Sequence, residues 1–193
     1  MPRVRQFDEQ EVLNKAMELF WKKGYHATSM DDLVKFAGIN RASLYGIFGG
    51  KKELFNKALE HYRSTNNNVL QRFLSQQTQV KAGLRNLFYH LIEESLADKD
   101  CKGCFVVNTT TELIPGDEEL ETRLKNNQEA IQKTFYNFLL QGAETGEVSE
   151  DKDLKAIANL LYTFFNGFRV ISKISDDAQD LRTSVDTILL LLD

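Results

Sequence analysis

The scarcity of proline limits what this chain can fold into more than any other feature of its sequence. Pro2 and Pro115 are its two prolines, and more than a hundred consecutive residues between them contain no helix breaker. Leu, Ala, Glu, Lys and Gln, which are all good helix formers, fill that stretch. No segment shows the sustained alternation of apolar and polar residues that is typical of strands. We therefore predict an all-α fold.

Amphipathic patterns predict short helices at the start of the chain and long helices after them. Three short helices are expected before residue 50, and a fourth begins near Lys51. We therefore predict a small N-terminal domain, the head, at residues 1–50, and a larger helical domain, the trunk, at residues 51–193. The later trunk helices are expected around residues 84–96, 103–113, 117–143, 151–173 and 177–192.

Charge is divided unevenly along the chain, whose net charge is −4. Residues 1–63 hold 11 Lys and Arg against 8 Asp and Glu, a balance of +3, whereas the remainder holds 13 against 20, a balance of −7. A basic end on an acidic body suits a DNA-contacting head on a sensing or assembling trunk. No signal peptide is evident, and the longest aliphatic run is far shorter than the roughly 20 residues of a membrane span. We therefore expect a cytoplasmic protein with no membrane partner.

A helix-turn-helix motif is indicated by two brief helices on either side of the turn Gly38-Ile39-Asn40. In this motif the second helix enters the major groove, and short polar or cationic side chains in its first turns contact bases or phosphates. Asn40, Arg41 and Ser43 fit that role, and Ala42 could meet a thymine methyl group. Gly46 would either leave room for the backbone to approach DNA or end the helix early.

Three segments closely resemble the N-terminal domain of the tetracycline-repressor family of bacterial regulators: residues 28–33 (TSMDDL), 37–45 (AGINRASLY) and 48–54 (FGGKKEL). The resemblance extends over roughly residues 8–60, and it implies that Thr28, Tyr45 and Lys51 clasp the DNA backbone. Ser29 stands at the same helix start as Thr28, where it could bind a phosphate, cap the helix, or do both. Without the resemblance, Tyr45 could instead pack in the core and Lys51 could simply be solvated.

The resemblance also implies a partner set: double-stranded operator DNA, a second copy of the chain, and an unknown small-molecule effector that binds in the trunk. Aromatic residues at helical spacing, together with two polar residues, could line the effector pocket. Aromatic residues at this spacing more often pack in the hydrophobic core. Apolar stripes on the last two helices could form a four-helix dimer interface, or could only close the core of one chain. The pocket candidates are Phe88, Tyr89, Phe105, Asn108, Thr109, Phe135, Phe138, Tyr162 and Phe165. The interface candidates are Leu161, Phe165, Phe168, Val185, Ile188 and Leu192.

Cys101 and Cys104 form the C-x-x-C pair of the trunk. Two thiols are too few for a disulfide framework, and a zinc site would need two more ligands than the nearby sequence offers. A thiol sensor of oxidants or electrophiles is one interpretation, with Cys104 at a helix start, and burial of Cys104 in the core is the other. No arrangement of residues favours catalysis or nucleotide hydrolysis, so we expect neither an enzyme nor a cofactor. A helical scaffold without DNA affinity is a further alternative, but it makes no use of the helix-turn-helix residues.

Overall fold

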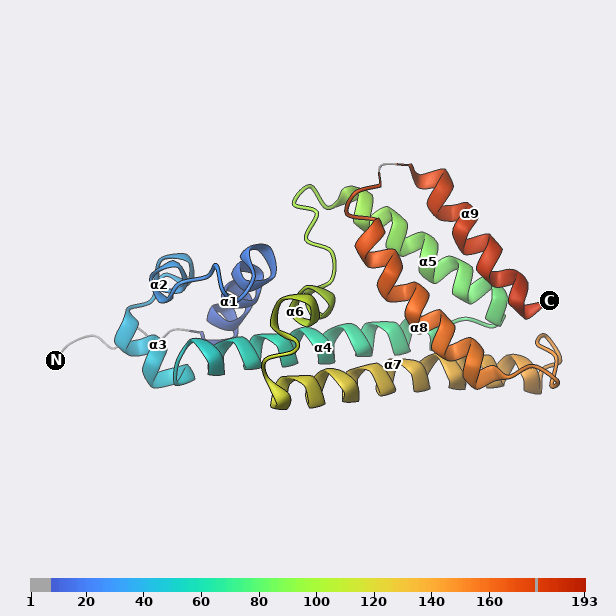
Figure 1. Cartoon of the computed structure of the whole chain (residues 1–193), viewed down its shortest axis with the longest axis horizontal. Coiled ribbons are helices and arrows are strands. Elements are labelled where there is room, and N and C mark those ends of the chain that lie inside the picture. The colour runs from blue at the N-terminus through green and yellow to red at the C-terminus, as the bar shows by residue number, and fades with distance from the viewer. Residues whose placement is uncertain (1–7, 176) are drawn as a thin grey trace.

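The computed structural model describes residues 8–175 and 177–193, and every regular element within them is helical (Figure 1). The all-α prediction is therefore confirmed. The elements are α1 (Glu9–Lys23), α2 (Met30–Ala37), α3 (Arg41–Phe48), α4 (Lys51–Ser75), α5 (Val80–Ala97), α6 (Phe105–Leu113), α7 (Glu118–Glu144), α8 (Leu154–Ile171), α9 (Ala178–Leu189) and a closing 3₁₀ turn, η1 (Leu190–Leu192).

Short polar residues set where the helices begin. Asp8 accepts hydrogen bonds from two backbone amides at the start of α1. Asp117, Asp153 and Asp177 cap α7, α8 and α9 in the same way, since each carboxylate accepts from an amide two or three residues further along the chain. Local sequence chemistry thus defines most of the helix starts.

Helix α4 is longer than its sequence pattern indicates. Its apolar face is clear up to Tyr62, but the run Asn66-Asn67-Asn68 follows, and asparagine is a poor helix former. The helix nevertheless continues to Ser75 because Leu70 and Leu74 are buried in the trunk core. Packing therefore overrides local propensity here.

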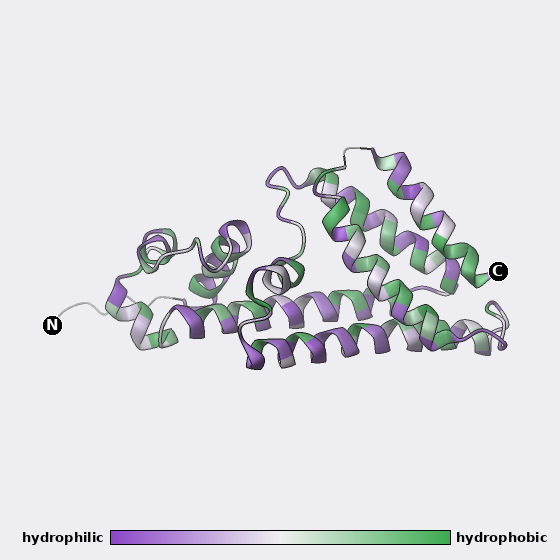
Figure 2. Cartoon of the chain, in the orientation of Figure 1, coloured by the Kyte–Doolittle hydropathy of each residue, from purple (hydrophilic) through white to green (hydrophobic). Residues whose placement is uncertain are grey.

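The helices form a small head and a layered trunk that share one long element (Figure 1). Helices α1, α2 and α3 build the head at one end of α4, and α4 then runs beside α7 through the trunk. Helix α8 packs along α7, and α9 packs along α5. In Figure 2 polar residues predominate along the outer sides of α4 and α7, whereas apolar residues predominate on α8.

Two hydrophobic cores hold these layers together, and α4 contributes to both. The head core does not end at residue 50, because Cys104 and Phe105 at the start of α6 and Leu120 and Leu124 of α7 pack in it. The division at residue 50 stays a prediction, but the head is packed directly on the trunk. A displacement of α6 would therefore be felt in the head core.

Candidate nucleic-acid interface and effector cavity

The turn between α2 and α3 has the backbone that a helix-turn-helix needs. Gly38 adopts φ +74° and ψ +25°, a left-handed conformation that favours glycine, and its N–H donates to the Val34 carbonyl across 3.0 Å. Ile39 is buried in the head core, and the Asn40 side chain accepts from the Ser43 N–H across 2.8 Å to cap α3. The sequence prediction of a turn followed by a capped helix is confirmed.

Helix α3 presents one face to its own head and the opposite face to solvent. Leu44 and Phe48 are 0% and 5% exposed. Arg41 and Ala42 are exposed, and Tyr45 is 47% exposed, so the packing alternative for Tyr45 is wrong. An exposed helix face with a cationic residue in its first turn can enter a major groove.

Gly46 belongs to this exposed face. The helix continues past it to Phe48, so the alternative that Gly46 ends the helix early is wrong. A Cβ atom built on Gly46 would meet no atom within 4 Å. The glycine therefore leaves bare backbone on the side of α3 that faces away from the chain.

Ser29 and Thr28 differ in their surroundings at the start of α2. The Ser29 hydroxyl accepts from the Asp32 N–H and donates to the Asp32 carboxylate, and the Ser29 N–H donates to that carboxylate as well. The backbone and side-chain hydrogen bonds from Ser29, together with Lys23, lower the pKa of Asp32 to about 2. Ser29 is thus a helix cap that remains exposed.

Thr28 requires a correction. Its side chain is 0% exposed, and its hydroxyl donates to the Gly24 carbonyl across 2.6 Å. The expected contact between this hydroxyl and a phosphate does not fit that burial, because the group is enclosed and its proton is already shared. Thr28 positions the loop between α1 and α2 instead.

Two cations flank the exposed face of α3. The Lys51 ammonium lies 4.3 Å from the centre of the Tyr25 ring, so Lys51 is held by a cation–π contact rather than being fully solvated. A guanidinium nitrogen of Arg41 lies 3.5 Å from the Asp31 carboxylate, and both side chains are exposed. An exposed pair of this kind contributes little to stability, so Arg41 can exchange its partner at small cost.

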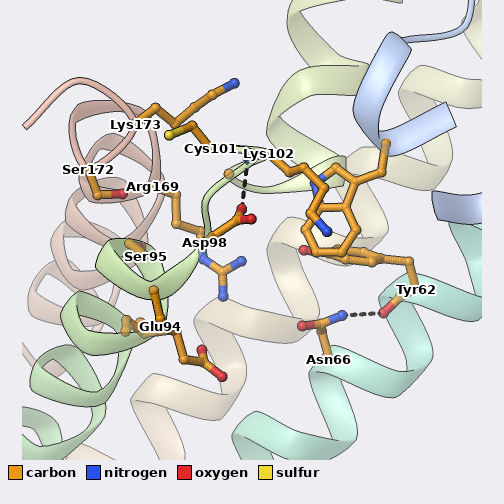
Figure 3. A pocket seen from close by; sticks show the side chains of 14 residues that line it. Tyr62, Asn66, Glu94, Ser95, Asp98, Cys101, Lys102, Arg169, Ser172 and Lys173 are labelled. Carbon is orange, nitrogen blue, oxygen red and sulfur yellow. Dashed lines mark hydrogen bonds between the residues drawn. The ribbon is translucent and has the colours of Figure 1, made fainter. Parts of the chain in front are cut away.

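Two adjoining cavities lie in the trunk. The larger cavity, about 480 Å³, is lined by α4, α5, α8, the loop between α5 and α6, and Trp21 of the head helix α1 (Figure 3). The smaller cavity, about 140 Å³, lies among α4, α5, α6, α7 and α8. The two cavities share Tyr62, Asn66, Leu91, Glu94 and Arg169 in their walls.

Arg169 stands at the boundary between the two cavities. Its side chain extends from α8 into the larger cavity, opposite Tyr62 and Asn66 of α4 (Figure 3), and its guanidinium lies 4.3 Å from the centre of the Phe165 ring. Burial would lower the pKa of Arg169, but the Cys104 and Tyr62 groups beside it raise that pKa above its ordinary value. Burial is also the main cause of a strongly raised pKa for Tyr62, followed by the neighbouring Cys104.

The wall of the larger cavity is tied to the head. The Lys102 ammonium lies 2.9 Å from the Glu18 carboxylate and 4.9 Å from the centre of the Trp21 ring. Lys22 pairs with Asp100 across 2.8 Å. The loop between α5 and α6 is therefore attached to α1 at one end of the cavity.

Comparison with known proteins identifies the chain. Residues 12–58 match the family described as "Bacterial regulatory proteins, tetR family", and residues 81–188 match the "Tetracyclin repressor-like, C-terminal domain". The chain belongs to the TetR family. It is a helix-turn-helix transcriptional regulator and not an enzyme.

Three relatives illustrate the likeness. The uncharacterised regulator YezE of Bacillus subtilis is 32% identical, with 100% of each chain covered. The transcriptional repressor ComR of Escherichia coli is 30% identical over 98% of this chain and 90% of its own. A cysteine mutant of the TetR-family regulator CifR, solved with a 26-base-pair operator duplex, superposes with a TM-score of 0.88 at 26% identity, covering 99% of this chain and 100% of its own.

The cavities of this TetR-family chain are not lined by most of the residues that sequence reasoning selected. Only Phe165 lines either cavity among the nine pocket candidates Phe88, Tyr89, Phe105, Asn108, Thr109, Phe135, Phe138, Tyr162 and Phe165. Phe88 and Phe135 are 0% exposed within the trunk core, and Phe105 is packed in the head core, so the plain-core alternative holds for them. The Asn108 amide donates to the Lys102 carbonyl, and Thr109 is buried.

The predicted dimer residues also need correction. Leu161, Phe168, Val185 and Leu192 are at most 5% exposed, because they close the core of the single chain. Ile188 is half-buried. Helix α8 carries a second apolar stripe on its outer side, and its members were not selected from the sequence: Leu160, Val170 and Ile171, with Ile174 just beyond the helix.

The two cysteines occupy different environments. Cys104 is the N-cap of α6 and is 6% exposed, and the Tyr62 hydroxyl donates to its Sγ across 3.8 Å, so burial in the core is confirmed. Cys101 is exposed. Across residues 8–175 and 177–193 no group of three His, Cys, Asp or Glu could hold a metal ion. In the same residues no helix is long and apolar enough to cross a membrane.

Proposed function

We propose that this TetR-family protein is a homodimeric repressor that binds operator DNA through its two heads and leaves the DNA when a small-molecule effector occupies the trunk. The exposed face of α3 carries the proposal, since Arg41, Ala42 and Tyr45 project from a capped helix that its own chain leaves uncovered. The CifR operator complex, which matches this chain over nearly its whole length, supports the same mode of binding. The protein would act in the cytoplasm, where its DNA lies.

Each candidate DNA residue has a proposed role. Arg41 and Ser43 would contact base edges, Ala42 would meet a thymine methyl group, and Asn40 would contact the DNA from the cap of α3. Phosphates would be held by Ser29 before α2, Tyr45 on α3 and Lys51 at the start of α4. Free backbone amides at the start of α2 would hold phosphates as well. Arg41 would exchange Asp31 for the DNA.

A second copy of the chain would cover the outer apolar stripe of α8. Leu160, Val170, Ile171 and Ile174 are 45–82% exposed and recur at helical spacing along one side. Gly167 lies within that stripe, and a Cβ atom built on it would meet nothing within 4 Å, so a neighbouring helix could approach closely. Pairing across a two-fold axis would place the two α3 helices in successive major grooves, about 34–36 Å apart.

The cavities offer a route from effector to head. Trp21 of α1 lines the larger cavity, and its ring contacts the Tyr62 ring of α4 edge-to-face, with centroids 5.0 Å apart. An effector that occupies this space would favour trunk states in which α1 and α4 sit differently, which changes the separation of the two heads. Release of the DNA requires that the effector bind this state more tightly than the DNA-bound state.

Selection of genomic fragments by the purified protein tests this function. The proposal predicts that the retained fragments share an inverted repeat and that a footprint covers two half-sites. Retention of fragments without any common sequence would contradict it.

A second candidate mechanism is sensing by Cys104. The Sγ of Cys104 lies between the Tyr62 hydroxyl and the Arg169 guanidinium at the edge of the cavities, which favours this residue over Cys101. An electrophile with an activated C=C bond that entered the smaller cavity would add to Sγ: the C–S bond forms, the C=C π bond breaks, and the adjacent carbon takes up a proton from solvent in exchange for the thiol proton. Treatment with N-ethylmaleimide should then release operator DNA from the native protein but not from Cys104→Ser, and equal release from both would exclude this mechanism.

A further inference from the structure

Arg169 is a half-buried cation without a counter-ion in the described part of the chain. Its Nε atom is buried and has no hydrogen-bond partner among residues 8–175 and 177–193. None of the ion pairs within those residues includes Arg169. Burying an unpaired guanidinium is unfavourable, so a protein retains one where another group completes the pairing.

The acidic residues near the cavities are engaged elsewhere. Asp98 accepts from the backbone N–H groups of Asp100 and Lys102, which shapes the loop between α5 and α6. Glu94 lies 3.5 Å from His90, one turn before it on α5. Asp98 and Glu94 both line the larger cavity, but neither carboxylate forms an ion pair with Arg169 in the structure as described.

The immediate neighbours of Arg169 are a tyrosine and a cysteine rather than a carboxylate. Burial raises the pKa of Tyr62, so this residue is a neutral phenol. The phenol donates a hydrogen bond to the Cys104 Sγ across 3.8 Å. The guanidinium thus faces these two side chains and the open space of the larger cavity.

The volume of the smaller cavity limits the size of the apolar part of any ligand that reaches Arg169. Its apolar wall includes Leu70, Phe73, Leu87 and Ile131, and its volume of about 140 Å³ is similar to that of an engineered apolar cavity of about 150 Å³ that holds benzene. One ring, or a branched chain of comparable size, would fill it. Asn66 lines both cavities, and its side-chain amide donates to the Tyr62 carbonyl across 2.9 Å (Figure 3).

We propose that Arg169 recognises the carboxylate of a compact apolar acid, whose ring or short chain occupies the smaller cavity while its carboxylate meets the guanidinium at the boundary of the larger one. This inference rests on the proposed effector function and names the chemical class of the effector. The planar guanidinium matches a carboxylate with two parallel hydrogen bonds, which a neutral ligand of the same shape cannot accept with equal strength.

Calorimetry with benzoate and its neutral analogue benzyl alcohol tests the inference on the full-length protein. The native protein should bind benzoate about 10- to 100-fold more tightly than benzyl alcohol, since a charge-assisted pair is added. Arg169→Gln should remove that preference, whereas Arg72→Gln, an exposed arginine of α4 outside both cavities, should retain it.

The ratio of the two affinities separates recognition from a merely structural role. If Arg169 only supports the fold, Arg169→Gln changes the melting temperature and leaves the ratio unchanged, and the inference is then overturned. It is also overturned if the native protein binds neither benzoate, phenylacetate nor hexanoate, or binds benzoate and benzyl alcohol equally. Where Arg169→Gln fails to fold, Arg169→Lys keeps the charge but not the paired geometry, and it should lose most of the preference.

Operator binding in the presence of benzoate distinguishes failure of the proposed function from failure of this inference. If the protein binds benzoate through Arg169 but stays on its operator at saturating benzoate, the carboxylate site exists and the proposed control by an effector is wrong. A thiol of Cys104 that is already ionised at neutral pH would supply the counter-ion itself and would contradict the inference.

Discussion

The Glu112 carboxylate of α6 accepts a hydrogen bond from the His26 backbone N–H across 2.7 Å, and it accepts a second from the Tyr25 N–H across 2.9 Å. One trunk side chain therefore holds the loop that follows α1. Gly24, with φ +85°, makes this approach possible, because a Cβ atom there would lie 2.7 Å from a Glu112 oxygen.

Glu112→Ala should destabilise the protein by about 1.5–3 kcal/mol, the usual contribution of hydrogen bonds to a charged group. Urea unfolding measures this change, and Glu129→Ala, an exposed glutamate of α7, provides the matched control. The same variant should respond less to an effector, because a contact between head and trunk is lost. Equal unfolding free energies for the two variants would show that the loop is held by other contacts.

Gly46→Ala should make the protein more stable and a weaker DNA binder. Alanine replaces glycine in the middle of a helix, which stabilises by about 1 kcal/mol, and the new methyl group meets no atom of its own chain. The same methyl group would intrude between α3 and the DNA. Thermal unfolding and operator titration of one preparation measure both effects, and an unchanged operator affinity would mean that this face of α3 does not approach the DNA.

Leu160→Glu should convert the proposed homodimer into monomers. A carboxylate at Leu160, the first residue of the outer stripe of α8, would be buried without a partner in the paired state. Leu96→Glu is a matched control, because Leu96 of α5 is exposed to the same extent, 45%, and lies outside the stripe. Sedimentation equilibrium compares the two variants, and dimers of Leu160→Glu as tight as those of the native protein would place the interface elsewhere.

The stability of the head should fall at acid pH in a window set by Asp32. Its pKa is about 2 in the folded chain, below the ordinary value of 3.8. A lowered pKa stabilises the fold above the ordinary value, and this stabilisation is lost as the pH falls from about 4 through about 2. Asp32→Asn should remove this part of the pH dependence in urea unfolding, whereas Asp31→Asn should leave it; a native-like dependence in Asp32→Asn would contradict the capping role.

The head could be predicted from sequence because its chemistry is local. Gly38 and Asn40 define the turn and the cap within three residues, and the structure has both where the pattern indicates. Thr28 shows the limit, since the sequence marks a helix start but does not reveal which of two neighbouring hydroxyls is enclosed.

The trunk was harder to predict because α8 is apolar on two sides. Periodicity identifies a stripe, but only packing against α7 decides that Leu161 is inside and Leu160 outside. Aromatic residues misled the search for a pocket because fully packed rings fill space rather than surround it. The useful signal was polar: Arg169 is a cation directly after Phe168 and one helical turn after Phe165. Trp21 and Tyr62 can be assigned to the same cavity as Arg169 only from the fold.

Operator titration of Arg41→Ala tests most directly whether the exposed face of α3 reads base pairs. Fluorescence anisotropy would compare the native protein, Arg41→Ala, Tyr45→Phe and the matched control Arg72→Ala on the selected operator and on a scrambled duplex, over a range of salt concentrations. Arg41→Ala should lose about 1–3 kcal/mol on the operator and little on the scrambled duplex, while Tyr45→Phe weakens both and Arg72→Ala weakens neither. Native affinity of Arg41→Ala and Tyr45→Phe for the operator would contradict the assignment of α3 as the reading helix.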